Sequence, residues 1–254
     1  MLSSRLPMAP LLTALQLLTR IPVPSSTPFS EDIARRAQAW FPWVGLVTGL
    51  AMAGPLLIAD PHLPNLAPFA AVLFPLLLTG ALHEDAIADS ADALFGGHTP
   101  ERRLEILKDS RLGTYGACAL WFLLTARFLA ARELYANLAV ADLIKTILFA
   151  HVFARTLAAL TSHCCAPRTI DTAQRTAPFT GKLSPLGLLI CMAPTVTVLT
   201  LDPPRAAITV APTIGAIVVA RLYLSRIGSL RGDALGCIIA LSETLMLARP
   251  ETLL

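Results

Sequence analysis

The residues with the clearest potential for chemistry are three aspartates spaced along one predicted helix. Asp85, Asp89 and Asp92 stand at positions i, i+4 and i+7 of the stretch from His83 to Asp92. At about 100° per residue, this spacing places the three carboxylates on one narrow face. A helix that simply becomes polar as it leaves a membrane would explain one or two acids. It explains poorly why the positions between them are small or apolar.

Carboxylates that lie one turn apart repel each other unless a cation sits between them. From Asp85 to Asp92 the helix rises by roughly 10 Å, so one six-coordinate ion is not easily held by both ends. Two oxygen-liganded ions fit better, as does one ion with further ligands from other helices. We therefore predict Asp85, Asp89 and Asp92 as metal ligands, and Mg²⁺ or Mn²⁺ as the cofactor, because oxygen-only ligands do not favour zinc.

A basic segment follows the three aspartates. In it, Lys108 and Arg111 are predicted to bind phosphate groups, with Asp109 facing the metals. The arginines that come earlier in the segment are interpreted as contacts to anionic lipid headgroups. Gly113 and Thr114 open the next apolar segment, and a glycine-rich helix N-terminus is a ready anion site. We therefore expect phosphate recognition beside the carboxylates.

Further charged residues lie inside or beside apolar segments. Arg155 and Lys182 are predicted to bind phosphate, and Asp233, at the start of the last apolar segment, is included among the substrate-binding residues. Ionisable groups in membrane helices are functional by default. Three histidines are instead interpreted as structural or interfacial: His83, His151 and His163.

The composition places these residues in a membrane protein. Of 254 residues, 55% are apolar and only 15% are charged, whereas soluble domains carry about 25% charged residues. Six segments approach the roughly 20 apolar residues that a spanning helix needs. These segments are Trp40–Ala59, Leu66–Leu82, Thr114–Ala131, Ala139–Ser162, Pro185–Leu201 and Ala206–Leu224, with a shorter seventh at Ala234–Ala248.

We predict an all-α fold, a polytopic membrane helix bundle with six or seven transmembrane helices plus short interfacial helices. The apolar stretch from Pro10 to Leu18 is too short to span and is expected to be interfacial. Residues 1–254 would form a single integral-membrane domain, with a catalytic segment at about 83–116. The stretch that carries the aspartates is expected to continue the second spanning helix.

Lys and Arg residues concentrate in every second connector, which predicts that the connectors holding the acidic and basic residues face the cytoplasm. The net charge of +3 is small and the basic residues are scattered, so the sequence does not support nucleic-acid binding. The five cysteines form no C-x-x-C pair, so a disulfide framework or a zinc site is not predicted.

The whole chain resembles the cobalamin synthase (adenosylcobinamide-GDP ribazoletransferase) family. The central acidic and basic block carries most of the resemblance. Further matches are Leu18 to Pro24, Phe41-Pro42 with Gly45, Arg155, Gly181-Lys182 and Gly232 to Gly236. Two positions differ, because Ala86 and Ala93 stand where the family usually has glycine.

The resemblance implies that the 3′-hydroxyl of α-ribazole, or of its 5′-phosphate, attacks the cobinamide-linked phosphorus of adenosylcobinamide-GDP and releases GMP. It implies a magnesium-dependent transferase in the bacterial cytoplasmic (inner) membrane, working late in vitamin B12 assembly. For that reaction, Glu84 is a candidate general base, and a homo-oligomer is compatible with the sequence. Two alternatives are a transporter that uses the acids as an ion or proton relay, and a lipid-forming alcohol phosphotransferase.

Overall fold

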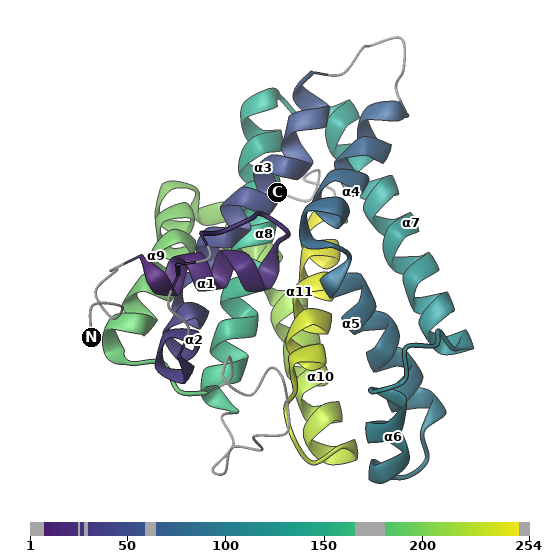
Figure 1. Ribbon diagram of the computed structural model, residues 1–254. Helices are drawn as coiled ribbons and strands as arrows, with labels where there is room; N and C mark the ends of the chain where they lie inside the picture. Colours follow the sequence, from purple (N-terminus) through teal and green to yellow (C-terminus); the bar gives the residue numbers. More distant parts are fainter. Residues whose placement is uncertain (1–7, 25, 28–29, 59–64, 166–180, 249–254) are drawn as a thin grey trace.

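The computed structural model describes residues 8–24, 26–27, 30–58, 65–165 and 181–248. Within these ranges the regular elements are helices (Figure 1), which confirms the predicted all-α fold. In chain order they include α1 (Ala9–Leu18), α2 (Glu31–Ala37), α3 (Phe41–Leu57), α4 (Leu66–Thr79), α5 (Leu82–Ala91), α6 (Pro100–Ile106), α7 (Thr114–Asn137), α8 (Val140–Cys164), α9 (Pro185–Leu201), α10 (Val210–Arg226) and α11 (Gly232–Leu247).

The bundle has the lengths and composition of a membrane protein. Four described helical stretches are long and apolar enough to cross a membrane: Glu31–Leu57, Thr114–Asn137, Val140–Cys164 and Pro203–Arg226. The pair α4 and α5 would make a fifth crossing if both halves formed one span. Large apolar side chains lie on the outside, among them Trp121, Phe122 and Leu189, each more than 60% exposed. The predicted number of six or seven crossings stays a prediction.

The core is built around α8 and α11, which lie beside each other in the middle of the bundle (Figure 1). Most side chains of both helices are buried. Helix α3 packs closely against α8 because it presents glycine at the contact. A Cβ atom at Gly45 would lie 2.6 Å from the carbonyl oxygen of His151. Small residues at helix contacts are typical of membrane bundles.

Helix α5 does not continue α4, which corrects the expectation from the sequence. The two helices meet at an angle of 89°. The break lies at Gly80 and Ala81, both in the left-handed region with φ of 67° and 60°. Their backbone N–H groups donate to the carbonyl oxygens of Leu77 and Leu76, which closes the end of α4. The aspartate-bearing helix therefore leaves the axis of the spanning helix at nearly a right angle.

Helix α5 packs against α11 through a contact with room for a single methyl group. A Cβ atom added to Gly236 on α11 would lie 2.5 Å from the Cβ of Ala86 on α5. One of the two positions where the family usually has glycine thus carries its methyl group in a space that Gly236 leaves free. The contact sets the distance between the helices that carry Asp85 and Asp233.

We expect Gly236→Ala to destabilise the protein by about 1–3 kcal/mol, the usual cost of overpacking a core. Adding Ala86→Gly should recover most of that loss, apart from roughly 0.5–1 kcal/mol for a glycine inside a helix. The free energy of unfolding, measured in mixed detergent micelles for both single variants and the double variant, tests this. Additive effects of the two substitutions would contradict the shared space.

Candidate functional site

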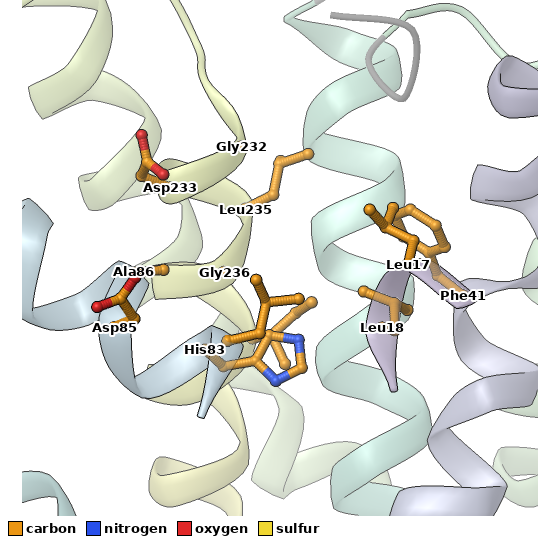
Figure 2. A pocket seen from close by; sticks show the side chains of 12 residues that line it. Leu17, Leu18, Phe41, His83, Asp85, Ala86, Gly232, Asp233, Leu235 and Gly236 are labelled. Carbon is orange, nitrogen blue, oxygen red and sulfur yellow. The ribbon is translucent and has the colours of Figure 1, made fainter. Parts of the chain in front are cut away.

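Helices α5 and α11 bring together three carboxylates, of Asp85, Asp89 and Asp233, and two of these, Asp85 and Asp233, line one cavity. Asp85 and Asp89 lie on the outer face of α5, with Asp85 exposed and Asp89 half-buried. Asp233 lies in the first turn of α11. All three are close enough for their negative charges to interact. Figure 2 shows Asp85 and Asp233 on the same side of the cavity, on either side of the contact between Ala86 and Gly236.

The opposite face of α5 is anchored inside the bundle, and this orients the aspartates. Glu84 forms an ion pair with Arg127 of α7. One turn and a half later, the Ser90 hydroxyl lies 2.7 Å from the Tyr223 hydroxyl of α10. Glu84 and Ser90 are both buried. With these side chains held inward, the helical periodicity turns Asp85 and Asp89 outward.

Asp92 has a different environment from Asp85 and Asp89, the other two aspartates predicted to share one helix face. It is buried at the start of a π-helical turn, Asp92–Gly96. Its carboxylate accepts hydrogen bonds from the backbone N–H groups of Gly113, at 2.7 Å, and Gly116, at 2.9 Å. It therefore caps the N-terminus of α7, which begins at Thr114. The Asp92 carboxylate thus occupies the anion site that the sequence predicts for phosphate at Gly113 and Thr114. The role of Asp92 as a metal ligand stays a prediction.

Asp109 and Arg111 pair with each other on the surface. The Arg111 guanidinium donates to both carboxylate oxygens of Asp109, with the shortest contact at 2.6 Å. Hydrogen bonds from Arg111 lower the pKa of Asp109 to about 2, so this carboxylate is ionised at every physiological pH. Lys108, beside them, is exposed. Phosphate binding by Arg111 would need its guanidinium to turn from Asp109 or to contact both groups.

Glu84 and Arg155 belong to a buried ionic network inside the bundle. The network joins α5, α7, α8 and α11. Glu243 accepts from Arg155 at 2.5 Å and from Arg127 at 3.0 Å, while Arg127 also pairs with Glu84. The Nδ1 atom of His151 lies 3.0 Å from Glu243. The structure thus places the candidate general base and one predicted phosphate ligand in a structural network rather than at the carboxylate rim.

Lys182 lies at another cavity, of about 420 Å³, which is formed by α1, α2 and the start of α9. Arg35 and Arg36 line the same cavity. Arg36 pairs with Asp32 at 2.7 Å. The residues around this cavity do not include Asp85, Asp89, Asp92 or Asp233. The structure therefore does not bring Lys182 together with Asp85, Asp89 and Asp233.

The donor set at the rim suits a hard divalent cation. Asp85, Asp89 and Asp233 offer oxygen ligands only. The positive charge of Arg231 lies close enough to attract the Asp233 carboxylate. Oxygen-rich, negatively charged sites favour magnesium or manganese. In the part of the chain that the structure describes, no three His, Cys, Asp or Glu side chains already surround one ion position. The chemistry of these side chains fits such a metal, and Asp233 could supply a further oxygen ligand from a second helix.

Together the fold and the rim define a polytopic membrane protein with a carboxylate site between two of its helices. The comparison with known families agrees with this class of protein and identifies one family within it. Residues 10–249 match the cobalamin-5-phosphate synthase family. The chain belongs to this family. It is a family of transferases, as the names of its relatives state.

Among the relatives are proteins named adenosylcobinamide-GDP ribazoletransferase from three bacterial genera. The one from Vibrio cholerae is 35% identical over 92% of this chain and 90% of its own length. The Bradyrhizobium diazoefficiens protein is 33% identical over 94% of this chain and 92% of its own. The Ralstonia nicotianae protein is 35% identical over 92% and 91%. No solved structure matches the chain.

Proposed function

We propose that this protein is an adenosylcobinamide-GDP ribazoletransferase, which joins α-ribazole or its 5′-phosphate to adenosylcobinamide-GDP and completes the nucleotide loop of cobalamin. The observation that carries the proposal is the convergence of Asp85 and Asp89 of α5 with Asp233 of α11, in a chain that belongs to this family from residue 10 to residue 249. The sequence block that holds Asp85 and Asp89 is the one on which the resemblance rests.

In this reaction the ribazole 3′-oxygen forms a bond to the cobinamide-linked phosphorus. The phosphoanhydride bond to GMP breaks, GMP carries away the bonding electron pair, and the hydroxyl proton passes to solvent. Such a transfer depends on positioning and on neutralising phosphate charge more than on covalent catalysis. Asp85, Asp89 and Asp233 would hold magnesium, and the bound metal would neutralise the diphosphate. Lys108, which is exposed and lies shortly after α6, is suited to contact a phosphate oxygen.

The alternation of basic connectors supports placing the carboxylate rim at the cytoplasmic face of the bacterial inner membrane. Both substrates would then reach it from the cytoplasm. The transporter alternative is weakened because Asp85 and Asp89 lie on a helix that turns away from the axis of α4 by 89°. An alcohol phosphotransferase would share the chemistry and differ in its acceptor.

Purified protein in lipid nanodiscs, supplied with adenosylcobinamide-GDP and α-ribazole, tests the proposal. We expect GMP and a complete corrinoid to form in equal amounts, with magnesium required and manganese able to replace it. Omitting α-ribazole should stop GMP release. GMP release that needs a lipid alcohol would instead identify the phosphotransferase, and solute uptake into proteoliposomes without any product would identify the transporter.

A further inference from the structure

The cavity that Asp85 and Asp233 line has further lining residues, and the proposed reaction assigns them no role. Its volume is about 110 Å³, and its walls come from α1, α3, α5 and α11. Apart from the two rim carboxylates and His83, the lining is apolar or glycine; it includes Leu17, Phe41 and Ile239. For comparison, an enclosed apolar cavity of roughly 150 Å³ binds benzene. This cavity is smaller, so a flat ring larger than benzene would fill it and extend out of its open side toward the rim carboxylates.

One buried polar atom in the lining lacks a partner. His83 is 3% exposed, and its Nε2 atom has no hydrogen-bond partner among the described residues. Figure 2 shows the imidazole turned from α5 into the cavity, facing Leu18 and Phe41 across it. A buried polar group without a partner raises the free energy of the folded chain. A ligand that supplies the missing hydrogen bond would recover that free energy.

We propose that this cavity binds the aromatic base of the acceptor nucleoside, and that His83 Nε2–H donates a hydrogen bond to the bare ring nitrogen of that base. This inference rests on the proposed function and specifies its acceptor subsite. The substituted benzimidazole of a ribazole is flat and largely apolar and has a single unsubstituted ring nitrogen. Guanine fits the apolar walls less well, because its polar edge would have to face the two rim carboxylates, which the proposed reaction assigns to the metal.

The position of the carboxylates completes the argument. Asp85 and Asp233 stand at the rim of the same cavity. A base held inside therefore leaves its ribose at the rim, where the 3′-hydroxyl has to meet the diphosphate. The sequence predicts a structural or interfacial His83, whereas the subsite gives it direct contact with substrate.

The test measures equilibrium binding by the intrinsic fluorescence of the ligand, with protein in nanodiscs and without adenosylcobinamide-GDP. Two ligands are compared: α-ribazole, and an indole riboside in which the bare ring nitrogen is replaced by C–H. For the wild-type chain we expect α-ribazole to bind about tenfold more tightly, the scale of one hydrogen bond. His83→Phe should remove this difference, and His83→Gln, which keeps an N–H donor, should restore part of it. Leu17→Trp, at a half-buried position of α1, should weaken both ligands by filling the cavity.

Equal affinity of the wild-type chain for the two ligands would overturn the hydrogen bond, and this measurement needs no variant to fold. Unchanged binding of α-ribazole by a folded Leu17→Trp variant would overturn the subsite. These outcomes are separate from the proposed reaction. A chain that binds α-ribazole with the expected selectivity but releases no GMP would leave the subsite standing and remove the proposed transferase activity.

Discussion

Replacing Asp89 with Asn lowers the rate of GMP release by about 100-fold or more and leaves the bundle folded. Asp89 is half-buried and interacts with the charges of Asp85 and Asp233. The amide keeps the shape of the side chain but loses the negative charge that would attract a divalent ion. Neutralising transition-state charge with a metal contributes several kcal/mol, and each ~1.4 kcal/mol is tenfold in rate.

Asp142→Asn is the matched control for this substitution. Asp142 is a half-buried aspartate in the first turn of α8, where it pairs with Lys145 at 3.2 Å and lies 4.0 Å from Arg205. It should retain full activity. Initial rates at several magnesium concentrations, together with thermal unfolding of each variant, separate loss of chemistry from loss of fold. Near-normal product formation by Asp89→Asn at saturating magnesium would refute the assignment of Asp89 as a metal ligand.

Replacing Arg127 with Met should destabilise the folded bundle by about 3–5 kcal/mol, the cost of leaving a buried charge without its partner. Arg127 is 7% exposed and contacts both Glu84 and Glu243. Glu243 would keep Arg155 and His151, but Glu84 would lose its ion pair with Arg127. The other carboxylate oxygen of Glu84 has no hydrogen-bond partner among the described residues. The free energy of unfolding in mixed micelles, followed by circular dichroism, measures the loss.

Arg132→Met is the control on the same helix, because Arg132 is exposed. Surface substitutions of this kind usually change the free energy of unfolding by less than about 0.5 kcal/mol. Adding Glu84→Leu to Arg127→Met should recover part of the stability, since an apolar pair of similar volume often replaces a buried ion pair at little cost. If Arg127→Met were as stable as Arg132→Met, the network would not hold the bundle together.

The sequence predicts the helical bundle and two of the three rim carboxylates well, because periodicity and hydropathy are local properties of the chain. The spacing of Asp85 and Asp89 determines that they share a face in any helix. The sequence predicts Asp233 as a substrate-binding residue, but its position next to Asp85 and Asp89 depends on the packing of α11 against α5. That packing is settled by the space between Ala86 and Gly236.

Other features depend on partners that no local pattern reveals. The partners of Asp92 are backbone N–H groups of residues 113 and 116, so no side-chain type marks the contact. Gly80 hints at the break before α5, but the left-handed Ala81 beside it has no sequence signature. The predictions from the sequence do not include Arg127, although a lone arginine inside an apolar segment is a usable signal. Its pairing with Glu84 and Glu243 required the fold.

The buried network of α5, α7, α8 and α11 has a consequence for a protein in an energised membrane. Its two guanidinium groups, of Arg127 and Arg155, face two carboxylates, of Glu84 and Glu243. Moving one elementary charge through the membrane voltage involves about 2.3 kcal/mol per 100 mV. A quartet of two positive and two negative groups is electroneutral, so the voltage does no net work on it when it moves as a unit. The interior of the bundle can thus hold these four charged groups while the membrane voltage exerts no net force on them.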